Sequence, residues 1–248
     1  MRGRSARAVK QRLESLALAG VTILPKPTGT TGAATVDRPE PTASTPAAGS
    51  GGSHVQVGAG GDGGRALDLI RAEVAECRRC EALACARRNT VFGSGSPAAR
   101  LCFLGEAPGA DEDASGLPFV GRAGQLLTKI IEACTLSRDE VYILNVLKCR
   151  PPDNRQPLPE EVANCREYFE RQLLAIGPEF ICCLGTTAAQ ALLETAEPIG
   201  RLRGRWFTHG RAQVICTYHP SYLLRNPGAK RHVWDDMQLL MARMGVGP

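Results

Sequence analysis

Four short apolar runs, each followed by a helix-like segment, constrain the fold of this chain more than any other feature. The runs are bounded by glycine or polar loops and cover residues 100–105, 141–147, 180–184 and 214–218. Helical patterns cover residues 65–76, 121–134, 159–176, 186–193 and 230–244. This alternation predicts a three-layer α/β/α sandwich around a four-stranded, largely parallel central sheet.

The loops after these predicted strands carry residues that a plain connector does not need. The loop Gly105–Gly124 contains several glycines, which let the backbone approach a ligand closely, together with acidic residues and an exposed Phe119. Asn145 lies near the end of the second strand, and His219 directly follows the last one. Ligands of parallel α/β sheets bind at the carboxyl ends of the strands, so we expect the functional site at this edge.

The N-terminal quarter of the chain differs in composition from the rest. Val9, Leu13 and Leu16 fall at helical spacing, so residues 1–24 are predicted to form a short amphipathic helix. Such a helix either frays in isolation or docks as a peptide to a partner protein. Residues 25–64 are rich in Pro, Gly, Ser, Thr and Ala, which predicts a disordered linker, with the folded domain over residues 65–248.

Bulk composition excludes several classes of protein. The apolar content of 43% is sufficient for a core, and the net charge of +5 is too small to indicate nucleic-acid binding without local basic loops. No apolar run reaches the roughly 18 residues that a membrane span needs. We therefore expect a cytoplasmic monomer without membrane contact. In that compartment the ten cysteines are expected to be metal ligands or buried thiols, not disulfides.

Four cysteines have the spacing of a metal site. Cys77 and Cys80 are separated by two residues, and Cys149 and Cys165 come from a distant segment. On ligand type alone, zinc and an iron–sulfur cluster fit equally well, and the alternative is four unrelated cysteines. Cys85 and Cys134 are expected to lie outside this site. The cysteines within the apolar strands are expected in the core, namely Cys102, Cys182, Cys183 and Cys216.

Three segments carry a resemblance to a known family. GEAPGADEDASGLPFVGRAGQLL, NVLKCRPPDNRQPLPEE and HPSYLLRNP resemble the motifs of the family 4 uracil-DNA glycosylases, the thermostable-type branch that carries a 4Fe–4S cluster. The likeness extends from about Leu67 to the C-terminus. It implies a monofunctional enzyme of base excision repair that flips uracil out of single- or double-stranded DNA and hydrolyses its N-glycosidic bond, which leaves an abasic site. It also implies that the four cysteines hold a structural 4Fe–4S cluster and not zinc.

The chemistry of base excision then suggests roles for the loop residues. A flipped base must be read in a pocket, where Phe119 could stack on its plane. The amide of Asn145 complements the acceptor O4 and donor N3 of uracil, a pattern that cytosine reverses. Negative charge gathers on O2 as the bond breaks. His219, which matches the family histidine, could donate a hydrogen bond there, assisted by the turn of Ala107, Pro108 and Gly109.

The choice of carboxylates rests on the resemblance. It points to Glu106 and Glu112 as the acids that stabilise a cation-like sugar and orient water, with Asp113 nearby and Asn154 as the hydrogen-bond partner of Glu112. The alternative is that Glu106 only caps its loop. Without the motifs, Asn145 would likewise be interpreted as a turn residue.

DNA contacts are expected from the same loops. Leu223 is the candidate for filling the space that the flipped base leaves in the duplex. The basic side chains Lys148, Arg150, Arg155 and Arg225 are candidates for phosphate contacts. Related cluster-bearing proteins that trap DNA covalently carry a basic insertion with a histidine after the first motif. None separates Gly109 from Phe119 here, so turnover is expected, and no motif lysine is placed for lyase chemistry.

Two rival functions remain on the sequence alone. One is a non-catalytic nucleic-acid-binding module built around structural zinc, which metal analysis and the visible absorbance of a cluster distinguish from an iron–sulfur enzyme. The other is an electron-transfer protein that uses the cluster. The single cluster and the three pocket motifs argue against it, and a redox titration without effect on base release would exclude it.

Overall fold

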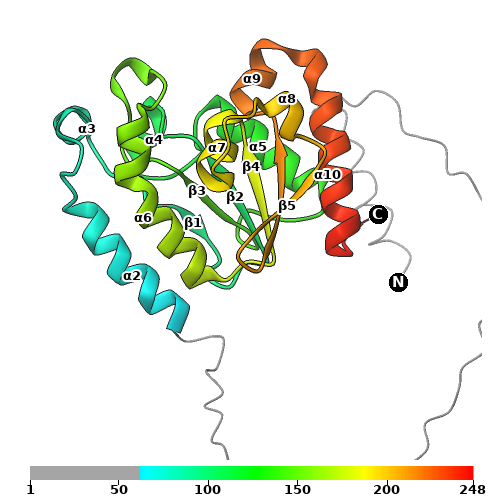
Figure 1. The fold of residues 1–248 in the computed structure, drawn as a ribbon, viewed down its shortest axis with the longest axis horizontal. Helices are drawn as coiled ribbons and strands as arrows, with labels where there is room; N and C mark the ends of the chain where they lie inside the picture. The colour runs from blue at the N-terminus through cyan, green and yellow to red at the C-terminus, as the bar shows by residue number, and fades with distance from the viewer. Residues whose placement is uncertain (1–61, 248) are drawn as a thin grey trace, which may run out of the picture.

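The structure, a computed structural model, describes residues 62–247 (Figure 1). The predicted N-terminal helix lies outside these residues, as does nearly all of the predicted linker. Helix α2 spans Asp62–Ala75, so the folded part begins slightly before the predicted boundary at residue 65, within the segment predicted as linker. No helix of the described part is both long and apolar enough to cross a membrane.

A six-stranded sheet forms the centre of the molecule, with the strand order β1-β3-β2-β4-β6-β5. The four predicted strands are its inner, mutually parallel members. Two antiparallel edge strands were not predicted, so the expected four-stranded sheet was too small. The strand bounds are β1 Ser94–Gly95, β2 Leu101–Gly105, β3 Tyr142–Asn145, β4 Phe180–Leu184, β5 Trp206–His209 and β6 Ala212–Thr217.

Helices cover both faces of the sheet, which confirms the three-layer α/β class. Alternate side chains of β2 divide between the faces: Cys102 and Leu104 pack in a core cluster with α2, α6 and α7, whereas Leu101 and Phe103 pack with α5 and α10. The predicted core cysteines are fully buried. The helix bounds are α5 Arg122–Ala133, α6 Pro159–Ile176, α7 Thr186–Leu193 and α10 Lys230–Met244.

Shorter helices occur between the predicted helices and strands. Helix α4, the 3₁₀ turn η1 and helix α9 follow β2, β3 and β6, so they gather at the carboxyl edge of the parallel strands, the upper edge in Figure 1. Of the remaining short helices, α3 and α8 follow α2 and α7, and η2 precedes α10. Their bounds are α3 Glu81–Ala86, α4 Ala110–Ser115, η1 Pro152–Asn154, α8 Ile199–Leu202, α9 Pro220–Arg225 and η2 Pro227–Ala229.

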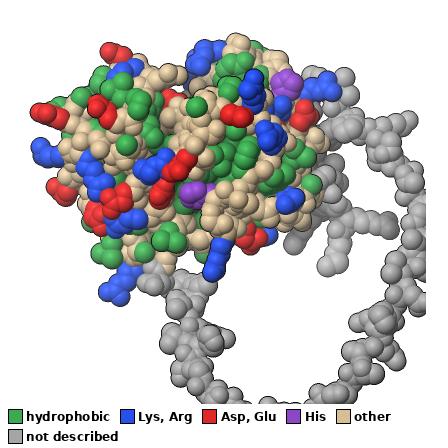
Figure 2. All heavy atoms as spheres, in the orientation of Figure 1, with side chains coloured by type: hydrophobic (Ala, Val, Ile, Leu, Met, Phe, Trp, Pro, Cys, Tyr) green, Lys and Arg blue, Asp and Glu red, His purple; other side chains and the backbone are tan. Residues whose placement is uncertain are grey.

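The outer face formed by α2 and α6 is covered with charges of both signs, intermixed in Figure 2. Arginines there form ion pairs with glutamates, as Arg171 does with Glu73 at 2.5 Å and Arg79 with Glu167 at 2.7 Å. Exposed pairs of this kind add little stability, and they leave no net positive surface for a polyanion. The DNA contacts that the resemblance implies are therefore not expected on this face.

Candidate functional site

A cavity of about 720 Å³ opens at the carboxyl ends of the parallel strands. The loops that follow β2, β3, β4 and β6 each contribute to its wall, as expected for a parallel sheet. Among the residues that line it are Glu106, Phe119, Asn145, Thr187, His219 and Arg225. The three sequence motifs therefore meet at one site.

At the floor of the cavity, the side chains of Asn145 and Phe119 lie very close to Gly105. A Cβ atom at this position would lie 2.3 Å from Asn145 Oδ1 and 2.6 Å from Phe119 Cζ, distances that real Cβ atoms do not show. Glycine is therefore required at the end of β2, because any side chain would push the Asn145 amide or the Phe119 ring away. The strand end, the amide and the ring form one packed unit.

The side chain of Asn145 is buried without a partner for its oxygen. The residue is 2% exposed, and Oδ1 accepts no hydrogen bond from any residue in the described part of the chain. A buried acceptor left unpaired costs about 1–3 kcal/mol, and most such atoms in native proteins are satisfied. Because Asn145 also lines the cavity, its oxygen is placed to accept a hydrogen bond from a ligand.

Phe119 is held in an uncommon backbone conformation. Its φ of 54° lies in the left-handed region, which bulky residues rarely adopt. Arg138 fixes the loop by donating to the carbonyl oxygens of Pro118 at 2.8 Å and Phe119 at 3.1 Å. The ring is only 6% exposed, contrary to the expected exposed side chain, and its centroid lies 5.6 Å from that of His219. Phe119 thus forms a wall of the cavity.

Glu112 connects two loops of the site. One carboxylate oxygen accepts from the backbone N–H of Gly109 at 3.1 Å, and the other accepts from Val120 at 2.9 Å and Gly121 at 3.0 Å. Both oxygens are therefore engaged in holding the Phe119 loop against the Ala107–Gly109 turn. The Gly109 N–H is thereby occupied, and Pro108 has no backbone N–H. The N–H of Ala107 is therefore the one donor of this turn that has no acceptor in the described chain.

The two residues predicted to support the acids lie elsewhere than expected. The Asp113 carboxylate is buried and accepts from the backbone N–H groups of Arg88 at 2.9 Å and Asn89 at 3.3 Å, so it anchors α4 to a neighbouring loop. Asn154 lines the cavity, but its Oδ1 accepts from Arg150 at 2.8 Å. The predicted bond between Asn154 and Glu112 is wrong, because backbone amides already occupy the glutamate.

Glu106 has a side-chain partner that the sequence analysis did not foresee. The hydroxyl of Thr187, in the first turn of α7, donates to Glu106 Oε2 at 2.5 Å. Both residues line the cavity and are partly exposed. Of the two predicted catalytic acids, Glu106 is therefore the one with a carboxylate oxygen left open, because Oε1 accepts no hydrogen bond within residues 62–247.

The imidazole of His219 is in a defined tautomer. Its Nδ1 accepts from the backbone N–H of Ser221 at 3.2 Å and contacts the hydroxyl of the same residue at 2.8 Å, so the proton of the neutral ring resides on Nε2. Burial lowers the pKa of His219 to about 4, with the charge of Arg225 acting in the same direction and that of Glu112 opposing it. At neutral pH the ring is a neutral N–H donor.

Lys148 is not a surface cation. It is 1% exposed, and its ammonium donates to the carbonyl oxygens of Asn145 at 2.7 Å and Phe92 at 3.4 Å. Burial lowers the pKa of Lys148 to about 7, whereas the neighbouring thiols Cys165 and Cys149 favour its charged form. The expectation that it contacts phosphate is wrong, because lysine was assigned to the surface by its charge alone.

Leu223 is also buried, so it cannot enter a duplex as placed here. It is 1% exposed and packs beneath α9 with α5 and α10, whereas its neighbours Tyr222 and Leu224 are more than a third exposed. Leu223 was favoured by its position in the motif. Because α9 is a helix, the side chains at positions 222 and 224 turn away from the core.

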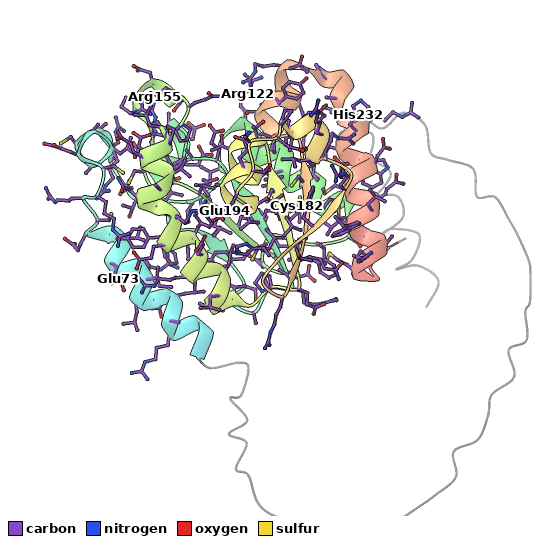
Figure 3. The ribbon with its side chains drawn as sticks, viewed as in Figure 1. Glu73, Arg122, Arg155, Cys182, Glu194 and His232 are labelled. Atoms are coloured by element: carbon purple, nitrogen blue, oxygen red, sulfur yellow. The ribbon has the colours of Figure 1, made fainter. Side chains whose placement is uncertain are left out.

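The remaining predicted phosphate contacts are placed at the cavity edge. Arg225 is exposed and lines the cavity, and Arg150 is partly exposed beside Asn154. Arg155 also lines the cavity, but its guanidinium forms a bidentate ion pair with the buried Glu161 at 2.6 and 2.9 Å. Figure 3 shows that Arg155 and Arg122 lie along the same edge of the molecule.

The four predicted ligand thiols belong to one neighbourhood. Electrostatic interactions connect Cys149 with Cys77 and Cys80, and connect Cys165 with Cys149 and Cys80. No three His, Cys, Asp or Glu side chains of residues 62–247 are close enough together to hold a single metal ion. Cys85 is exposed and Cys134 is buried, and neither takes part in these interactions among the thiols.

Positive groups surround the thiols. The guanidinium of Arg87 donates to Cys149 Sγ at 2.9 Å and to the Cys77 carbonyl at 2.8 Å. Burial raises the pKa of the Cys149 thiol, and this hydrogen bond opposes the rise. The backbone N–H of Lys148 likewise donates to the Cys165 thiol, whose pKa burial raises to about 11. Such a setting fits an anionic group held by thiolates.

Several cavity residues were not predicted. Thr186 and Thr187 follow β4, and the rule that ligands bind at strand ends could have identified them. Ser221 lies within the motif that begins at His219, and Tyr218 directly precedes that motif, so both could have been included with it. Ile199 comes from α8, and no signal in the sequence places this short helix at the cavity.

Comparison with known proteins identifies relatives of this chain. The family model described as "Uracil DNA glycosylase superfamily" matches residues 92–238. A type-4 uracil-DNA glycosylase of Archaeoglobus fulgidus is 44% identical over 180 residues, which cover 69% of this chain and 90% of the relative. For the type-4 uracil-DNA glycosylase of Thermotoga maritima the identity is 42%, over 69% and 91% of the two chains. For that of Saccharolobus solfataricus it is 40%, over 73% and 88%.

The lowered pKa of the partly buried His219 predicts a pH dependence of stability. The unfolded chain protonates His219 near its usual pKa of 6.5, whereas the folded chain does so only near 4. The free energy of unfolding contributed by the neutral ring is therefore fully present above pH 6.5 and falls as the pH is lowered towards 4. Urea unfolding across this range should show that His219→Asn, which cannot titrate, loses this part of the slope. An unchanged slope in the variant would contradict the burial of a neutral His219.

Proposed function

We infer that this chain, which belongs to the uracil DNA glycosylase superfamily and to its type-4 branch, excises uracil from DNA by hydrolysing the N-glycosidic bond and leaves an abasic site for base excision repair. The observation that carries this function is the unpaired, buried Oδ1 of Asn145 in the cavity. A flipped uracil would supply the missing donor.

Base recognition follows from the chemistry of the amide. Uracil presents a donor at N3 beside an acceptor at O4, which match the oxygen and the NH₂ group of Asn145. Cytosine presents an acceptor at N3 and a donor at its exocyclic amine, so it would leave the buried amide mismatched. The ring of Phe119, held beside the amide by the close approach to Gly105, would stack on the plane of the base.

Charge develops at both ends of the breaking bond. Negative charge on uracil O2 would be stabilised by the Nε2–H of His219, which is neutral and therefore does not require a buried positive charge, and by the Ala107 N–H. The positive charge of the sugar would be stabilised by a carboxylate that also orients water. Glu106 is assigned this role, because Glu112 is fully engaged with three backbone amides.

Hydrolysis without strand cleavage is also proposed. A lyase needs an amine that reaches the sugar to form a Schiff base. No lysine is among the residues that line the cavity in the described chain, and the ammonium of Lys148 is buried against backbone carbonyls. The enzyme is therefore proposed to be monofunctional, with residues 62–247 as its catalytic unit.

DNA would bind across the edge of the sheet where the cavity opens. Arg225 and Arg150 are proposed to contact phosphates, with Arg155 anchoring the loop of Arg150 through its ion pair with Glu161. The side chain that fills the vacated space in the duplex is proposed to be Leu224, which is 39% exposed on α9, supported by Tyr222.

The four thiols are proposed to hold a 4Fe–4S cluster. Cysteine thiolates are its usual ligands, and the cationic Arg87 and Lys148 offset the negative charge of such a site. The preference for a cluster over zinc rests on the type-4 relatives and on the motifs shared with the cluster-bearing branch. When bound, the cluster would cross-link Cys77 and Cys80, next to α3, to the loop after β3 and to α6, which is a structural role.

The reading of the base by Asn145 is tested with two substitutions. Asn145→Ala should slow single-turnover release of uracil by about 30- to 1000-fold, because a key contact in a desolvated site is lost. Asn145→Asp should weaken the discrimination between uracil and cytosine, because the carboxyl group changes the donor pattern. Rates on matched oligonucleotides that contain either base measure both effects. Near-wild-type release by the Ala variant would remove Asn145 from the pocket.

Metal analysis tests the cluster site. Single Ala substitutions at Cys77, Cys80, Cys149 or Cys165 should abolish iron content and visible absorbance and reduce soluble yield, because ligation contributes folding free energy. The exposed Cys85 provides the matched control, and Cys85→Ala should keep its iron. Stoichiometric zinc in the wild-type protein, or iron retained by the four variants, would disprove the assignment.

Substitutions in α9 test the side chain that enters the duplex. Leu224→Ala should slow uracil release from double-stranded DNA more than from single-stranded DNA, because only the duplex has a space to fill. Leu223→Ala should instead lower the free energy of unfolding by about 2–5 kcal/mol, because it leaves a cavity in the core. If Leu223→Ala slowed release from the duplex and Leu224→Ala lowered the free energy of unfolding, Leu223 would be the residue that leaves the core to contact DNA.

A further inference from the structure

The hydrogen bond between Thr187 and Glu106 joins two separate elements of the cavity wall. Glu106 directly follows β2, and Thr187 lies in the first turn of α7 after β4. The hydroxyl donates to Oε2 at 2.5 Å, and it is the only side-chain donor to this carboxylate within residues 62–247. The position of the acid therefore depends on a residue outside the three sequence motifs.

Both ends of this hydrogen bond are fixed by the backbone. The carbonyl of Glu106 accepts from the Leu147 N–H at 3.0 Å, which extends the parallel pairing of β2 and β3 beyond the sheet. On the other side, the Gly185 N–H donates to Thr217 at 2.8 Å. Because the backbone is held at both ends, the Thr187 hydroxyl mainly restricts the rotation of the Glu106 side chain.

The first turn of α7 is also tied to the histidine. Gly185, the N-cap of α7, has a φ of 90°, and a Cβ there would lie 2.9 Å from His219 Cβ. Glycine thus lets the turn that carries Thr187 pack directly against the residue proposed to stabilise the leaving base. The first turn of α7 therefore fixes the position of Glu106 relative to His219.

Thr187 does not act as a helix cap. A capping hydroxyl comes from the N-cap residue and accepts from a backbone N–H in the first turn. Here the N-cap is Gly185, and the Thr187 hydroxyl instead donates to a side chain from another strand. Its neighbour Thr186 is more exposed and makes no such hydrogen bond within the described chain.

We propose that Thr187 is a positioning residue for hydrolysis, which holds Glu106 through Oε2 so that Oε1 is left to accept a hydrogen bond from the attacking water. This inference rests on the proposed function. As the bond between C1′ and N1 breaks, its electron pair leaves with uracil, and the water oxygen forms a new bond to C1′. The proton of the water passes to Glu106 Oε1 and then to solvent, while Thr187 keeps its own proton.

A double-mutant cycle with single-turnover uracil release as the readout tests this role. Thr187→Val keeps the shape of threonine but lacks the hydroxyl, and Thr187→Ser keeps a hydroxyl. Glu106→Ala is made alone and in combination with Thr187→Val. Thr208→Val, on the exposed side of the edge strand β5, is the matched control. Thermal unfolding, iron content and DNA affinity are measured on the same preparations of full-length protein.

The expected result is a loss specific to the acid. Thr187→Val should release uracil about 10- to 100-fold more slowly, the range for losing one hydrogen bond to a charged group, with unfolding temperature and DNA affinity unchanged. Thr187→Ser and Thr208→Val should remain close to wild type. In the Glu106→Ala background, Thr187→Val should have little further effect, because the two residues act as a unit.

Other outcomes overturn the proposal. A wild-type rate in Thr187→Val, or an equal loss in both backgrounds, would show that the hydroxyl does not act through Glu106. A wild-type rate in Glu106→Ala would remove the acid from the reaction and Thr187 with it. Absence of uracil release by the wild-type protein would overturn the proposed function itself, a result distinct from a failure of Thr187 alone.

Discussion

The close packing of Gly105 against Asn145 and Phe119 is the contact on which the pocket depends. Adjacent parallel strands place the ends of β2 and β3 side by side, with Gly105 paired to Asn145. Without a Cβ at Gly105, the Asn145 amide and the Phe119 ring can occupy the same small volume at the strand ends. The unsatisfied oxygen of the amide is then tolerable only because the cavity admits a ligand that can pair with it.

A second constraint links this pocket to the proposed cluster. Lys148 lies between the two, with its ammonium on the Asn145 carbonyl and its backbone N–H on the Cys165 thiol. A buried ammonium without a carboxylate is costly, and nearby thiolates would lower that cost. Loss of the four ligand thiols would therefore destabilise the end of β3 as well as α6. In this way the proposed cluster would support base recognition without taking part in the chemistry.

The sequence predicted the parts of the fold that local patterns determine. The inner strands were recognisable because they are short and mostly apolar, and β4, α6, α7 and α10 begin and end where expected. The edge strand β5 was missed because its side chains are only partly buried, so it lacks the apolar signature. The carboxyl-edge rule correctly placed Asn145, Phe119 and His219 at one cavity.

Predictions that depended on tertiary context were less successful. Lys148 and Leu223 were assigned to the DNA surface from residue type and motif position, but packing against the sheet buries both. The partners of Glu112 are backbone amides and that of Glu106 is Thr187, and neither choice follows from residue spacing. Hydrogen bonds between loops depend on three-dimensional positions, which are not encoded in a local pattern.

The central claim is that this cavity binds and releases uracil and not cytosine. The most direct measurement is single-turnover release of free base by the wild-type protein from oligonucleotides that are identical except for one uracil or cytosine. We expect free uracil and an alkali-labile abasic site from the first oligonucleotide only, with the strand intact before alkali. Release of cytosine at a comparable rate, or no release from either oligonucleotide, would contradict this claim.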